Sequence, residues 1–146
     1  MRLFDCHAHW STRRGYVFQT KEAQESQRRI WGTDPQFETE DEMAATMRKN
    51  NVRALMDFAW PAFAPTPIEE IQALHDYGFE VQRRNPDVIF GHWLTFDPRI
   101  GAAGIKEYER CVVAKTGFIG FGIIGQARHG HPPSDPIWDP FYKVSI

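Results

Sequence analysis

The 146-residue sequence carries 17 Lys and Arg against 19 Asp and Glu, which gives a formal net charge of −2 at pH 7. A nearly neutral chain lacks the basic footprint of a nucleic-acid-binding protein. No apolar run approaches the roughly 20 residues that span a bilayer. The cysteines, Cys6 and Cys111, suggest no disulfide framework. Because no leader-like segment opens the sequence, we expect a cytoplasmic protein with neither nucleic-acid nor membrane partners.

The first third of the chain predicts a strand, a polar stretch with one helix, a second helix and a second strand. Residues 2–6 are short and apolar, and residues 21–31 have helical composition. Thr39 and Glu42 have the spacing of a capping box, so a helix should begin there. Residues 52–58 form the next apolar strand.

The rest of the chain continues the same alternation. A helix should begin with Pro67 at its first position and end before Pro86. Residues 88–96 predict the third strand, residues 102–114 the next helix, and residues 118–124 the fourth strand. On the helix over residues 102–114 we expect a buried stripe of Ile105, Tyr108, Val112 and Val113. In the fourth strand, glycines at 120 and 122 would allow close approach of backbone or ligand.

Strands separated by helices favour parallel βαβ units, and the near-continuous apolar strands suit a sheet that is covered on both faces. We therefore expect one α/β domain over residues 1–146. Four such strands fit either an open doubly wound sheet or half of a closed (β/α)8 barrel. A complete barrel needs about 250 residues, and periodicity alone does not choose between the two.

The chemistry is concentrated at the end of the first strand, in Asp5-Cys6-His7-Ala8-His9. Alternation along a strand places His7 and His9 on one face. Imidazole nitrogens bind zinc at about 2.0–2.1 Å, and two histidines on one face can share an ion. His7 and His9 are therefore predicted metal ligands, with two surface histidines as the alternative.

Residues 3–9, Leu-Phe-Asp-Cys-His-Ala-His, resemble the first-strand signature of the amidohydrolase superfamily. Later segments resemble its aminocarboxymuconate-semialdehyde decarboxylase-like branch. They are residues 42–57, 85–91, 96–99, 117–122 and 135–142.

This resemblance implies the first four βα units of a (β/α)8 TIM barrel, and a truncated chain that ends inside the fourth helix. It also implies a divalent metal, zinc as the first choice and manganese as the alternative. The family takes a further His from the fifth strand and an Asp from the eighth, which this chain does not supply. The implied activity is hydrolysis or decarboxylation of a small, carboxylate-bearing molecule. Within this chain it assigns no catalytic residue.

Five residues are predicted to contact the substrate. Arg13 and Arg14 follow the ligands and can bind a carboxylate through bidentate contacts, although exposed surface charge is the alternative. Trp10 and Trp60 either wall the pocket or pack in the core. His92 either points into the barrel or packs under a helix.

Other histidines have plainer explanations. His75 lies on the apolar stripe of its helix, which favours a packing or surface role. His129 and His131 form a second pair at ligand spacing beside Arg128, but a Gly/Pro-rich loop favours solvated side chains.

Two rival hypotheses remain. A non-catalytic half-barrel would expose sheet edges and pair with a copy of itself or another chain. A deoxyribonuclease-like branch also opens with His-x-His but tends to carry an acidic residue at the fourth strand. Residues 120–123 contain none, so this branch ranks low.

Overall fold

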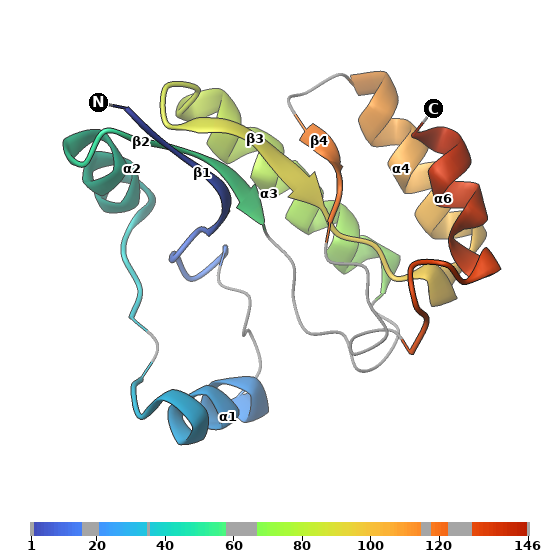
Figure 1. Cartoon of the computed structure of the whole chain (residues 1–146), viewed down its shortest axis with the longest axis horizontal. Coiled ribbons are helices and arrows are strands. Elements are labelled where there is room, and N and C mark those ends of the chain that lie inside the picture. Colours follow the sequence, from blue (N-terminus) through green and yellow to red (C-terminus); the bar gives the residue numbers. More distant parts are fainter. Residues whose placement is uncertain are drawn as a thin grey trace.

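A four-stranded parallel sheet forms the centre of the computed structural model (Figure 1), which describes residues 2–15, 21–34, 36–57, 67–114, 118–122 and 130–145. The strands follow one another across the sheet in chain order, and each pair of neighbours is parallel. They are β1 (Leu3–His9), β2 (Val52–Asp57), β3 (Ile89–Leu94) and β4 (Phe118–Phe121). The predicted alternation of strands and helices is confirmed.

The helices connect these strands and cover one face of the sheet. α2 packs on β2, α3 on β3, and α4 on both α3 and α6, whereas α1 lies apart from the sheet (Figure 1). Within the described residues, no helix combines the length and the apolar character needed to cross a membrane. The helices are α1 (Lys21–Trp31), α2 (Glu40–Lys49), α3 (Ile68–Arg84), α4 (Ala102–Ala114) and α6 (Asp139–Val144), with short 3-10 turns η1 (Pro98–Ile100) and η2 (Pro136–Trp138).

The predicted start of α2 is confirmed in detail. The Thr39 hydroxyl accepts a hydrogen bond from the Glu42 amide, while the Glu42 carboxylate accepts one from the Thr39 amide. This reciprocal pair satisfies two backbone donors that the first helical turn leaves open. α3 begins at Ile68, with Pro67 just before it, one residue later than expected.

The core lies between the sheet and the helices, in two clusters. Trp10, Met56 and Val81 belong to the cluster near β1 and β2. Phe96 and Phe141 belong to the second cluster, which also contains residues of α4. Each of these side chains is at most 1 % exposed, and burial of a large apolar side chain stabilises a fold by about 1.5–3 kcal/mol.

Among the described residues, no helix packs on the opposite face of the sheet. In β2, Ala54 and Met56 face the helices, so alternation turns Arg53 to the other side. There the Arg53 guanidinium lies 4.9 Å from the ring centroid of Phe90, and Phe90 packs edge-on against Phe4 at 5.5 Å. Phe4 and Phe90 are 55 % and 46 % exposed. A partly exposed, largely apolar inner face is what half of a barrel presents.

Candidate metal centre

The carboxyl ends of β1 and β2 bring His7, His9 and Asp57 together. Because the two strands are parallel and His9 pairs with Asp57 in the register, both strands end at the same edge. The register shifts between Asp5 and Ala8, and this irregularity lies beside His7. The two imidazole rings have centroids 5.1 Å apart, and one donor atom from each of the three residues lies within 4.8 Å of the others.

Hydrogen bonds orient the histidines. The His9 Nδ1 lies 3.0 Å from the main-chain carbonyl oxygen of Asp57. Since a carbonyl only accepts, this Nδ1 carries the proton, and Nε2 keeps a lone pair for a metal. The His7 amide donates to the Asp5 carboxylate at 2.9 Å, which fixes the backbone beside the first ligand.

The carboxylate of Asp57 completes the cluster. Its Oδ2 lies 3.1 Å from Nε2 of His7, and its side chain is 1 % exposed, whereas that of His7 is 50 % exposed. The cluster is thus buried on the β2 side and reachable from solvent on the β1 side. Two imidazoles and a carboxylate are a donor set that suits Zn²⁺, so the residues present fit the metal that the sequence predicts.

A hollow of about 290 Å³ opens at this cluster. Trp93 and Phe121 supply its apolar walls, and a Cβ on Gly122 would come within 3.0 Å of Trp93. The near neighbour is a side chain, so the close approach of backbone or ligand predicted for the glycines at 120 and 122 stays a prediction. The described lining residues are Cys6, His7, Asp57, Trp93, Phe121 and Gly122.

The two arginines predicted to bind a carboxylate line a different hollow, of about 380 Å³. Arg14 lies over the ring of Tyr77 at 4.0 Å and within 3.6–3.9 Å of the carboxylates of Glu80 and Glu40. Arg13 lies over Phe37 at 4.8 Å. Among the described residues that line the hollow at His7, neither arginine is present. Their role in carboxylate binding stays a prediction.

Of the three remaining predicted contacts, the structure describes Trp10 and His92, and both side chains are buried. Trp10 is fully buried in the first core cluster. His92 is 1 % exposed and packs edge-on against Phe79 of α3 at 4.8 Å, so it lies under a helix rather than in the barrel. Burial, and after it the charge of His75, lower the pKa of His92 to about 3, which keeps the ring neutral. Trp60 lies outside the described residues.

The second histidine pair is described in part. His131 Nδ1 lies 2.9 Å from the Asp135 carboxylate, just before η2, and its side chain is 32 % exposed. This contact is a local one within the loop. Arg128 and His129 lie outside the described residues.

The amidohydrolase family model matches residues 4–145. The chain belongs to the amidohydrolase family. A crystal structure titled as an amidohydrolase II shares the fold with a TM-score of 0.55 at 16 % identity. That match covers 97 % of this chain and 45 % of the other, so the chain spans less than half of that protein's length. No curated protein matches. The strands therefore correspond to the first βα units of a TIM-barrel amidohydrolase, a family that typically binds a divalent metal.

The sequence prediction for this amidohydrolase chain missed Asp57. Its signal was available, because Asp57 is the last residue of β2 and the carboxyl ends of parallel barrel strands carry the active site. The pattern that identifies Asp57 is an acidic residue at the end of an apolar strand, where that strand lies next to the one that carries His-x-His.

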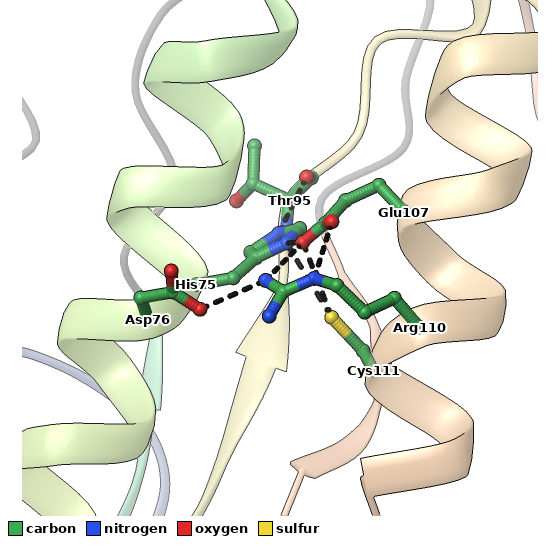
Figure 2. Close-up of polar contacts among 6 residues, drawn as sticks. All are labelled: His75, Asp76, Thr95, Glu107, Arg110 and Cys111. Carbon is green, nitrogen blue, oxygen red and sulfur yellow. Dashed lines mark hydrogen bonds and ion pairs between the residues drawn. The ribbon is translucent and has the colours of Figure 1, made fainter.

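A second group of potential ligands, buried between α3 and α4, is shown in Figure 2. His75 Nδ1 donates to the Glu107 carboxylate at 2.8 Å, and His75 Nε2 lies 3.0 Å from the Thr95 carbonyl oxygen and 3.2 Å from the Thr95 amide nitrogen. Arg110 donates to both Glu107 oxygens at 2.7 Å. The Cys111 thiol donates to Glu107 at 3.4 Å.

These contacts favour a structural role over a metal site. The guanidinium of Arg110 already supplies the positive charge beside Glu107, and both ring nitrogens of His75 have protein partners. Burial, and then the Glu107 charge, raise the pKa of the Cys111 thiol, which keeps it protonated and unsuited to coordination. The packing role expected for His75 agrees with this network, since its side chain is 2 % exposed.

Proposed function

We propose that this chain is part of a metal-dependent hydrolase or decarboxylase in the aminocarboxymuconate-semialdehyde decarboxylase-like branch, and that it supplies the first-strand metal ligands. Its substrate would be a small, carboxylate-bearing molecule, and its metal zinc, with manganese as the alternative. The observation that carries the proposal is the convergence of His7 and His9 at the carboxyl end of β1, beside a hollow. Family membership supports a metal-dependent activity.

Residues of this chain would hold the metal ion and line the hollow in which a substrate binds. His7 and His9 would hold the ion, and when bound it would supply a water of pKa near 7 or polarise a substrate oxygen. The Asp57 carbonyl keeps His9 in the tautomer that ligation requires. Trp93 and Phe121 give the hollow apolar walls against which the body of a small organic acid can pack. Exposed, unpaired Cys6 is consistent with a reducing, cytoplasmic location.

Metal retention tests the proposal. The chain is loaded with zinc or manganese and dialysed, and bound metal is measured by plasma mass spectrometry. We expect retained metal in the unaltered chain and loss of most of it in the His7→Ala/His9→Ala double variant. His131→Ala is the matched control, because His131 lies in a separate loop and should leave retention unchanged.

Reaction type is measured on the metal-loaded protein with a panel of small aromatic and unsaturated acids and their amides. Release of carbon dioxide indicates decarboxylation, and release of amine indicates hydrolysis. Equal metal retention in the unaltered chain and the double variant would contradict the proposal.

The open sheet face favours one second candidate, a non-catalytic half-barrel that pairs with a copy of itself. Leu3, Phe4 and Phe90 are each about half exposed on or near β1, an edge strand of the described sheet. Exposed edges and apolar patches promote association. Sedimentation equilibrium tests this candidate: a stable monomer at all concentrations rules it out, and a dimer without retained metal supports it over the enzyme.

A further inference from the structure

We propose that Asp57 is a third protein ligand of the metal, so that β1 and β2 together supply a His-His-Asp set. This inference rests on the proposed metal site at His7 and His9. It differs from the ligand set that the resemblance implies, in which the later ligands come from the fifth and eighth strands. The Asp57 side chain would coordinate the ion while its main chain orients His9.

The distance between His7 and Asp57 fits two ligands of one ion. Atoms bonded to zinc at about 2.0–2.1 Å, with angles between those of octahedral and tetrahedral geometry, lie about 2.9–3.4 Å apart. The observed distance from His7 Nε2 to Asp57 Oδ2 is 3.1 Å. The two atoms can therefore bind one cation with little movement of either side chain.

Burial and charge argue for the same role. The Asp57 side chain is 1 % exposed, and a buried carboxylate is costly unless it is paired or coordinates a metal. Its oxygen points at the imidazole that is itself a predicted ligand. A cation between the Asp57 carboxylate and the His7 imidazole would neutralise the carboxylate and accept the lone pair of the His7 Nε2.

A third ligand also raises the number of protein ligands that this chain supplies to the ion. Catalytic zinc sites usually have three protein ligands and one open position. With His7 and His9 alone the ion would keep most of its water, whereas His7, His9 and Asp57 reach the usual number. The rival role is that of a positioning residue, in which Asp57 accepts a hydrogen bond from His7 and never contacts the ion.

Asp57→Asn separates the two roles, because Asn keeps the size and the acceptor oxygen but removes the anionic donor. Zinc affinity is measured by calorimetric titration, and the ligand field by visible absorption of the Co²⁺-loaded protein. We expect Asp57→Asn to weaken zinc binding more than about 100-fold. Mutation of a residue that only hydrogen-bonds to a metal ligand typically weakens metal binding by roughly 10–100-fold. We also expect its Co²⁺ spectrum at saturation to change.

Asp41→Asn, at an exposed position in the first turn of α2, is the matched control and should leave affinity and spectrum unchanged. An Asp57→Asn protein that shows the unaltered Co²⁺ spectrum at saturation would overturn the inference, even with a lower affinity, since that is the behaviour of a positioning residue. If His7→Ala also binds zinc like the unaltered chain, the proposed metal site itself fails.

A measurement on the unaltered chain covers the case in which Asp57→Asn does not fold. Infrared difference spectra between zinc-loaded and metal-free protein, with and without ¹³C-labelled aspartate, report whether an aspartate carboxylate coordinates the ion. A label-sensitive shift of the carboxylate stretch on loading is expected. Its absence in a protein that binds zinc would overturn the inference.

Discussion

At the scale of single residues, the buried carboxylate of Glu107 has partners on two helices. It is 1 % exposed and accepts hydrogen bonds from His75, Arg110 and Cys111, which joins α3 to α4. Burial would raise its pKa, but the hydrogen bonds from His75 and Arg110 outweigh this and lower the pKa to about 2. The ionised form is therefore a stabilising part of the folded state.

Glu107→Gln should lower the free energy of unfolding by about 3 kcal/mol, the low end for breaking a buried ion pair, because Arg110 is 42 % exposed and partly solvated. Urea unfolding at neutral pH measures this. Glu109→Gln, exposed on the same helix, is the control and should stay within about 0.5 kcal/mol.

The same two proteins compared at low pH show in which direction the stabilisation by Glu107 changes with pH. A folded-state pKa below the ordinary value of 4.5 means that the stabilisation is present above pH 4.5 and is lost as the pH falls towards 2. The gap between the unaltered chain and Glu107→Gln should close over that range. A gap that is independent of pH would contradict the assignment.

At the scale of elements, local sequence signals predicted where helices and strands lie but not every buried face. The start of α2 followed from Thr39 and Glu42, whose capping geometry is local. On α4, the expected burial of Val113 was wrong, since its side chain is 79 % exposed. Periodicity counts apolar residues, whereas α4 turns Glu107 and Cys111 inward, where Glu107 has partners on α3 and α4. The partner on α3, His75, lies 32 residues away in the sequence, so a short sequence window does not reveal it.

Thr39→Ala should reduce the free energy of unfolding by about 1 kcal/mol, because it removes the side chain that caps α2. Thr46→Ala provides the matched control in the exposed middle of the same helix, where alanine is the better helix former. Thermal unfolding followed by circular dichroism compares the two. A Thr39→Ala protein as stable as Thr46→Ala would show that the cap contributes nothing.

At the scale of the whole molecule, strand order decided what periodicity left open. Alternating strands and helices suited both an open doubly wound sheet and half of a barrel. The observed order, with each strand beside its predecessor and helices on one face, is that of barrel units. The histidine pair was predictable because His7 and His9 are close in sequence. Asp57 was not recognised: its place at the end of an apolar strand was a signal, but its closeness to His7 depends on how β1 pairs with β2.

The central claim is that the carboxyl end of β1 holds a metal through two imidazoles. Zinc K-edge X-ray absorption of the zinc-loaded chain tests it most directly. The predicted result is two imidazole ligands and otherwise oxygen at about 2.0–2.2 Å. A spectrum without imidazole scattering, or dominated by sulfur at about 2.3 Å, would contradict it.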